Sequence, residues 1–306
     1  MRNKDKLTLR SAATLFRDGA LIAGRAEKAG TLRRAGGKYR VGSFIKPLNS
    51  PTRYPEYQVF HRMIADEATR ANSVLRVLDV GSPKLFTLLL TERLPLLEVT
   101  SLDIWDRAIE EARALAGGLS ANAQSRLKLA VADIRKPLAP ELLPEQGYDV
   151  AFAMSVIEHV EPNPGGDVVA MKAMAKIMKK GGALIISIPV DRELRDEHTA
   201  QPAYGAHDAH VDEGQGSFFQ RVYDQARASD LVSYMEAAGM TLEECVLVTW
   251  PQDRLFRAFW RIPGTKMKGL LGPFYPLFSP RFTARSSAEV PAITRGGDLV
   301  MRLRKA

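Results

Sequence analysis

The sequence is poor in cysteine and in long apolar runs. Cys245 is the only cysteine among 306 residues, which excludes an intramolecular disulfide and a thiolate metal cluster. No stretch reaches the roughly 18 consecutive apolar residues that indicate a membrane-spanning helix. The basic start of the chain is not followed by the apolar segment of a secretory signal. These absences predict a cytoplasmic protein.

Acidic residues are scarce at both ends of the chain. Residues 1–50 hold twelve Lys or Arg and three Asp or Glu, and residues 251–306 hold eleven and three. Because the net charge of the whole chain is +8, residues 51–250 carry nine net negative charges. Basic flanks of this kind suit a peripheral contact with a membrane or another anionic partner, although solvated basic faces explain them equally well. No nucleic-acid-binding motif is present, which argues against nucleic acid as the partner.

Short β-branched runs alternate with helical stretches after residue 73. This alternation is typical of a mostly parallel sheet covered by helices on both faces, an α/β class of fold. We predict a basic helical N-terminal extension over residues 1–73 and one α/β domain over residues 74–306. That domain would contain an aromatic and basic insert at about residues 251–296. The predicted strands cover residues 74–80, 97–102, 127–131, 148–154, 183–188, 241–250 and 298–303.

The residues that end the first two strands are suited to bind a nucleotide-like ligand. Ligands of an open parallel sheet bind outside the carboxyl ends of its strands. The first strand ends in Asp79, and the tight turn at Gly81 leads to Ser82, a good N-cap for a helix whose free amides face the ligand. Asp103, next to Ile104, follows Gly81 by 22 residues. That is close to the spacing of about 20 for an acid that binds a ribose diol.

The next two strand ends carry further candidates. Asp133 could accept a hydrogen bond from an exocyclic amine, and Ile134 could pack on a base. The fourth strand runs into Ser155-Val-Ile-Glu158-His159. Each acid alone is as well explained as a helix N-cap, but acids at the carboxyl ends of three strands favour a shared ligand site.

Candidate catalytic residues are Glu158 and His159, together with His207 and His210 in the loop after the fifth strand. Any of them could act as a general base if the substrate is a hydroxyl. His207-Asp-Ala-His210 with Asp212 has a spacing similar to that of metal ligands. In a loop rich in Gly and Ala this spacing is a weak signal, and we favour a loop that binds the substrate without a metal.

From Val74 to Pro189 the sequence resembles the class I S-adenosylmethionine-dependent methyltransferases, in particular the group called methyltransferase domain 11. The most specific part is the segment from Ser155 to Val160, followed by a helix and Lys180-Gly-Gly. The resemblance implies a Rossmann-like, seven-stranded, mostly parallel sheet with the last strand antiparallel. The family's first loop usually has two or three glycines, whereas Ser82-Pro83-Lys84 follow Gly81 here, and this departure bears on cofactor affinity.

The resemblance also implies the roles of the strand-end residues and the reaction. S-adenosylmethionine would contact Asp79 and Gly81 with its methionine portion, Asp103 with its ribose, Asp133 and Ile134 with its adenine, and Ser155 near its sulfonium. Ser82 and Ile104 would be further cofactor-binding residues. Its methyl group would pass to an oxygen, nitrogen or carbon nucleophile of a small-molecule, glycan or lipid acceptor.

Two other functions explain part of the same pattern. An NAD-dependent oxidoreductase would share the first strand and Asp103, but the full Gly-x-Gly-x-x-Gly is absent. A non-catalytic nucleic-acid-binding protein with a degenerate methyltransferase fold would explain the basic flanks.

Overall fold

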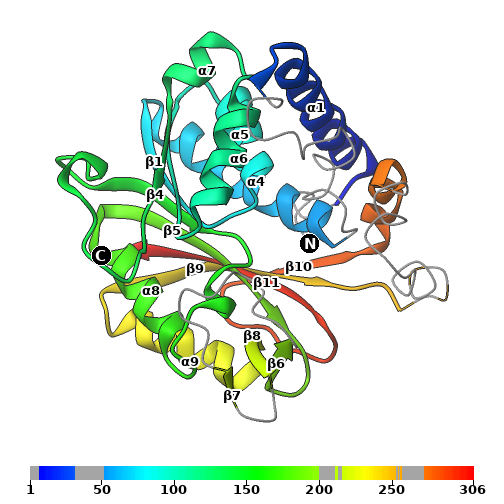
Figure 1. Cartoon of the computed structure of the whole chain (residues 1–306). Helices are drawn as coiled ribbons and strands as arrows, with labels where there is room; N and C mark the ends of the chain where they lie inside the picture. The colour runs from blue at the N-terminus through cyan, green and yellow to red at the C-terminus, as the bar shows by residue number, and fades with distance from the viewer. Residues whose placement is uncertain are drawn as a thin grey trace.

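A twisted sheet of eight strands forms the centre of the molecule (Figure 1). The computed structural model describes residues 7–31, 52–199, 211–212, 216–252, 254, 256 and 272–306. The strand order is β10-β9-β11-β5-β4-β1-β2-β3. The bounds are β1 Leu75–Val80, β2 Leu97–Asp103, β3 Leu127–Val131, β4 Tyr148–Ala153, β5 Met178–Val190, β9 Met240–Thr249, β10 Thr283–Ser287 and β11 Gly297–Lys305.

The first five strands are parallel, and the last strand, β11, is antiparallel to both of its neighbours, β5 and β9. This confirms the predicted class of fold and the antiparallel last strand. The predicted number of seven strands is corrected to eight, because β10 pairs with the outer edge of β9. β10 reads Thr-Ala-Arg-Ser-Ser and has no large apolar side chain, so its residues show no strand pattern.

Helices cover both faces of the sheet. One face carries α1 Leu9–Lys28, α4 Arg53–Ala71, α5 Lys84–Arg93 and α6 Asp106–Ala116, and the other carries α8 Gly166–Lys176 and α9 Gln225–Glu236 (Figure 1). The first face is held by an aromatic cluster in which Phe86 contacts Tyr57, Phe60 and Phe152. Short helices follow at α7 Ala121–Ser125, η3 Pro140–Leu142, η4 Ile157–His159 and η5 Gly272–Arg281. In the described part of the chain, no helix is long and apolar enough to cross a membrane.

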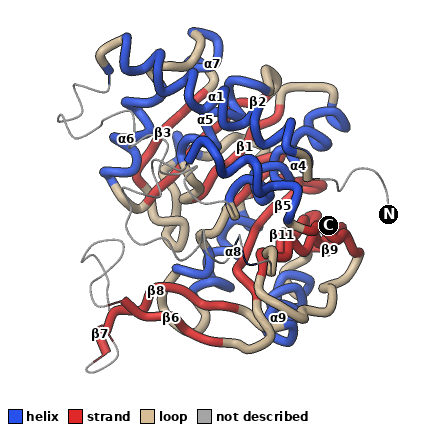
Figure 2. Tube along the Cα trace, turned by 90° about the vertical axis from the view of Figure 1, so that its right-hand side faces the viewer, coloured by secondary structure: helices blue, strands red, loops and turns tan. Residues whose placement is uncertain are grey.

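A second, three-stranded sheet was not predicted. It consists of β6 Arg195–Thr199, β8 Gly216–Val222 and β7 Val211–Asp212, in that order (Figure 2). β8 contacts η4, the short helix that follows β4. The second sheet therefore lies against the segment that carries Glu158 and His159.

Candidate active site

Asp79 at the end of β1 is completely buried, and its oxygens already have donors within the protein. The backbone N–H of Ser82 donates to Oδ1 at 3.2 Å, and the hydroxyls of Thr87 and Ser101 donate to Oδ2 at 2.7 and 2.6 Å. The carboxylate thus ties the turn after β1 to α5 and to β2. These hydrogen bonds indicate that Asp79 fixes the conformation of the loop after β1.

Gly81 and Ser82 join this loop to the end of β4. Gly81 has φ +65°, and a Cβ there would lie 2.8 Å from Cγ1 of Val156. Glycine is therefore required both by the backbone conformation and by the close approach of Val156. The hydroxyl of Ser82 accepts a hydrogen bond from the N–H of Met154 at 3.0 Å. The loop after β1 therefore contacts the segment that follows β4.

Asp103 lies at the end of β2 beside Lys84, the first residue of α5. Nζ of Lys84 lies 3.1 Å from Oδ2 of Asp103 and 3.8 Å from Oδ2 of Asp79, and it donates to the carbonyl of Leu102 at 3.0 Å. Lys84 is only 10% exposed in its side chain. Asp103 also accepts from the N–H of Trp105 at 3.0 Å, and the neighbouring Ile104 is 51% exposed. Lys84 thus brings two predicted ligand residues together.

Asp133 lies beyond the end of β3, next to Asp103 in the sheet, because the N–H of Ala132 donates to the carbonyl of Asp103 at 2.9 Å. Its carboxylate pairs with the guanidinium of Arg135, with Nη2 2.8 Å from Oδ2. Burial would raise the pKa of Asp133, but the hydrogen bonds from Arg135 outweigh it and lower that pKa below its ordinary value. Ile134 is buried.

Ser155, just after β4, is held by residues from two other elements. It adopts φ +50°, which is uncommon for a residue other than glycine. Its N–H donates to Oγ of Ser187 on β5 at 2.9 Å, and its hydroxyl donates to Oε1 of Glu56 on α4 at 2.8 Å. Arg53 of α4 contacts the same hydroxyl and lies 2.6 Å from Oε2 of Glu56. These contacts stabilise the strained conformation at the expected position of the methyl group.

Three buried carboxyl groups from different elements influence one another electrostatically, and one of them contacts Ser155. They are Glu56 on α4, Glu158 on η4 and Asp298 on β11, which are 0%, 1% and 6% exposed. Glu56 is fully bonded to Arg53, Ser155 and Ser187, and Asp298 accepts from the indole N–H of Trp250 at 3.1 Å. Oε2 of Glu158 has no hydrogen-bond partner among the described residues.

Burial and mutual repulsion favour the protonated forms of two of these acids. Burial raises the pKa of Glu158 to about 8, and the charges of Glu56 and Asp298 add to the shift. Burial and the charge of Glu56 also raise the pKa of Asp298. Burial lowers the pKa of His159 to about 4, so this ring is neutral at pH 7. His159 Nδ1 lies within hydrogen-bond distance of the carbonyl of Phe219, and a neutral ring must donate to that acceptor.

Arg221 on β8 fixes the segment that carries Glu158. Its guanidinium donates to the carbonyls of Val160 at 2.9 Å and Pro162 at 2.8 Å, and to the side chain of Asn163 at 2.7 Å. Arg221 is 2% exposed. The second sheet therefore positions Glu158.

Sequence reasoning missed Arg53, Glu56 and Asp298. They lie far from the strand-end motifs along the chain, and only the packing of α4 and β11 brings them to β4. His207 and His210, predicted as candidate bases, lie outside the described residues. Within the described ranges, no group of three or more His, Cys, Asp or Glu could hold a metal ion.

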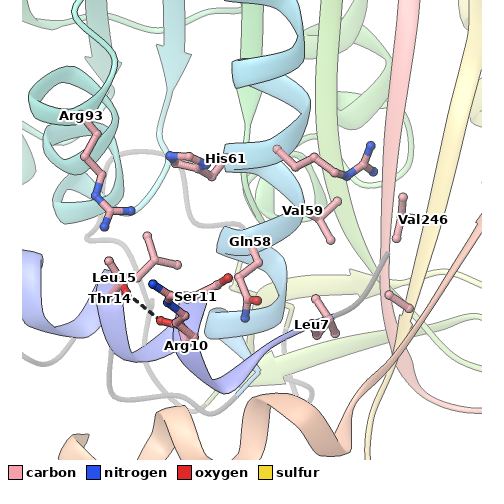
Figure 3. Close-up of a pocket in the computed structure, with 12 residues that line it drawn as sticks. Leu7, Arg10, Ser11, Thr14, Leu15, Gln58, Val59, His61, Arg93 and Val246 are labelled. Carbon is pink, nitrogen blue, oxygen red and sulfur yellow. Dashed lines mark hydrogen bonds between the residues drawn. The ribbon is translucent and has the colours of Figure 1, made fainter. Parts of the chain in front are cut away.

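A cavity of about 380 Å³ lies elsewhere, between α1, α4 and the sheet (Figure 3). It is lined by side chains that include Ser11, Gln58 and His61, and by Arg62 and Arg93. Arg62 lies 2.7 Å from Glu244, and Arg93 lies 2.6 Å from Asp18. Arg62 and Arg93 thus already have carboxylate partners, and Arg10 is a third guanidinium that lines the cavity.

No curated protein matches the sequence. Among solved structures, the N-methyltransferase NodS from Bradyrhizobium japonicum in complex with S-adenosylhomocysteine has 15% identity and a TM-score of 0.43, over 81% of this chain and 86% of that one. An O-methyltransferase from Brevibacillus brevis, also in complex with S-adenosylhomocysteine, has 13% identity and a TM-score of 0.49, over 86% of this chain and 79% of that one.

The model of a family described as a methyltransferase domain matches residues 71–239. This range contains Asp79, Asp103, Asp133, Ser155 and Glu158, and it exceeds half of the chain. The protein therefore belongs to this methyltransferase family and is a class I enzyme that uses S-adenosylmethionine as its methyl donor.

Proposed function

We propose that the protein transfers the methyl group to an acceptor whose nucleophile must first lose a proton, and that Glu158 accepts this proton. The observation that supports the proposal is the unpartnered Oε2 of Glu158, buried beside Ser155 at the carboxyl end of β4. A general base must lie within hydrogen-bond reach of the proton it removes and have a pKa near the working pH. Small-molecule, glycan and lipid acceptors with oxygen, nitrogen or carbon nucleophiles all present such protons.

The residues at the ends of β1, β2 and β3 suit S-adenosylmethionine. Asp103 offers carboxylate oxygens to the ribose diol, and the exposed Ile104 together with Ile134 offers apolar contacts to the adenine. Asp133 faces the same edge of the sheet. The methionine portion would lie over Gly81, where a side chain is excluded, with Asp79 and Ser82 fixing the loop. When bound, S-adenosylmethionine supplies an electrophilic methyl group on a positively charged sulfur.

The side chains around Ser155 orient the acceptor in this proposal. Ser155 and Arg53 present hydrogen-bond groups beside Glu56, and Arg53 is 30% exposed in its side chain. His159 is neutral and, held by the carbonyl of Phe219, packs on the ring of that residue. In methyl transfer the protein mainly holds the nucleophile in line with the methyl group and excludes water.

We also propose that residues 1–73 form an extension that completes the acceptor site. Arg53 and Glu56 belong to α4, which precedes the matched methyltransferase segment, and both contact Ser155 within it. Asp298 follows that segment. The acceptor site would thus combine residues inside 71–239 with residues outside them, whereas the cofactor residues all lie inside them.

The cofactor site is tested by measuring S-adenosylhomocysteine binding with calorimetry. Asp103→Ala should weaken binding by about 10- to 100-fold, since it removes hydrogen bonds to a charged group that contribute about 1.5–3 kcal/mol. Asp230→Asn, at an exposed position of α9, is the matched control and should bind like the wild type. Equal affinity of Asp103→Ala and wild type would show that Asp103 does not hold the ribose.

A further inference from the structure

The cavity between α1, α4 and the sheet is a second place at which a small molecule can bind. Its volume of about 380 Å³ falls in the range of about 300–1,000 Å³ that is typical of small-molecule sites. Apolar side chains from α1, α4 and β9 line it, among them Leu15, Val59 and Val246 (Figure 3). None of the described residues that line it is a strand-end residue predicted to hold S-adenosylmethionine. The cavity is therefore separate from the candidate cofactor site.

The polar side of the cavity is rich in hydrogen-bond donors. Arg10 from α1, Arg62 from α4 and Arg93 from the end of α5 line it together with His61. A guanidinium group has five N–H donors and no acceptor. None of the described residues that line the cavity is acidic. Figure 3 shows His61 extending from α4 toward the side of the cavity on which Arg93 lies.

The carboxylates next to the cavity do not neutralise all of this positive charge. Arg62 is paired with carboxylates that do not line the cavity. Asp18, however, is shared by two guanidinium groups, since it lies 2.6 Å from Arg93 and 2.9 Å from Arg17. Arg10 has no carboxylate partner among the residues that the structure describes. Positive charge is therefore in excess on the side of the cavity that α1 and α5 form.

His61 adds a hydrogen-bonding group that the protein itself does not use. Within the described ranges its imidazole makes no hydrogen bond to another residue. Burial and the charge of Arg93 lower the pKa of His61, so the ring is neutral at pH 7. A neutral imidazole carries one N–H donor and one acceptor nitrogen. Its N–H is therefore available to an oxygen of a ligand that binds at Arg93.

We propose that this cavity is a second ligand site that binds a small organic anion, a carboxylate group on a short apolar chain. The carboxylate accepts hydrogen bonds from Arg10, Arg93 and His61, because it supplies the negative charge and the acceptors that the lining lacks. The apolar chain packs on Leu15 and Val246. A neutral alcohol of the same length offers the apolar chain without the charge, so it binds more weakly.

The test measures the binding of hexanoate and of hexanol to the full chain by calorimetry, at constant ionic strength. We expect hexanoate to bind at least about 10-fold more tightly than hexanol, and its Kd to stay the same when S-adenosylhomocysteine is added. Arg10→Met should weaken hexanoate binding about fivefold, since it removes a cation that has no other partner. Ala284→Phe puts a ring into the cavity and keeps every guanidinium, and it should weaken binding at least about 10-fold. Arg107→Met removes an exposed guanidinium of α6 outside the lining, and this matched control should bind like the wild type.

Several outcomes would overturn the anion site. They are absence of hexanoate binding, equal affinity for hexanoate and hexanol, and wild-type affinity in Arg10→Met. Competition between hexanoate and S-adenosylhomocysteine would place the anion at the cofactor site instead of in the cavity. Far-UV circular dichroism of each variant should match that of the wild type. Because Arg10 is exposed, Arg10→Met keeps the fold and decides the test even if Ala284→Phe does not fold.

Discussion

The two ends of α4 carry buried glutamates with opposite surroundings. Glu56 lies in its first turn and Glu67 near its end, and eleven residues correspond to about three turns, so both face the sheet. On β11 the alternate residues Asp298 and Arg302 face the same side as Val300, which packs with α4, while Leu299 packs on the opposite face. The same helix and strand therefore build both clusters.

At the end of the sheet remote from Ser155, the acids around Arg302 and Arg304 have guanidinium partners. Arg304 binds both oxygens of Glu67 at 2.8 Å and also pairs with Glu243, and Arg302 lies 2.9 Å from Glu244. The hydrogen bond from Arg304 lowers the pKa of Glu243, the opposite of the shift at Glu158. Matched charges thus make a structural clamp, whereas buried acids that outnumber their cations can hold and release protons.

Removing Glu67 from its cluster with Arg302 and Arg304 should give the largest change in the free energy of unfolding. Glu67→Ala leaves Arg302 and Arg304 short of a partner, and removing one member of a buried ion pair costs about 3 kcal/mol or more. Urea denaturation at pH 7 would measure this loss in the free energy of unfolding. Glu110→Ala, at an exposed position of α6, should change it by no more than about 0.5 kcal/mol. Equal stability of Glu67→Ala and wild type would mean that Glu243 and Glu244 suffice.

Glu158, which is buried near Ser155, should make the free energy of unfolding fall as the pH rises. The folded-state pKa of Glu158 is raised from 4.5 to about 8, so the folded state holds the proton more tightly than the unfolded chain. This contribution to stability is fully present below pH 4.5 and is lost as the pH rises toward 8. Relative to Glu158→Gln, the wild type should lose about 1.4 kcal/mol between pH 6 and pH 7. Parallel stability curves for the two proteins over this range would contradict the shift.

Lys84 allows cofactor binding to be compared with and without the lysine that pairs with Asp103. It already occupies Oδ2 of Asp103, which the ribose would need. We expect Lys84→Met to tighten S-adenosylhomocysteine binding about fivefold, or about 1 kcal/mol, in calorimetry. The gain should be larger for S-adenosylmethionine, since its sulfonium no longer meets a nearby cation. Lys179→Met, whose lysine pairs with Asp149 away from this edge, is the control. Weaker binding in Lys84→Met would indicate that the lysine holds Asp103 in place for the cofactor.

Local patterns predicted the elements of the sheet well where the chain alternates clearly. The strands predicted at 97–102, 127–131 and 148–154 match β2, β3 and β4 to within one residue. The second sheet and β10 were not predicted, because their strands are short and mostly polar. Lys84 was recognised only as a departure from the family's loop, and its contact with Asp103 required the coordinates.

The sequence by itself determined the class of fold, the methyltransferase family and the strand ends at which Asp103, Ser155 and Glu158 lie. Such features depend on local periodicity and on motifs whose residues are near one another in the chain. The folded arrangement was needed to show that the charges of Glu56 and Asp298 act on Glu158, while Glu67 is neutralised by Arg304. The pKa of a carboxyl group depends on burial and on charges brought from distant segments, and neither is written in the local sequence.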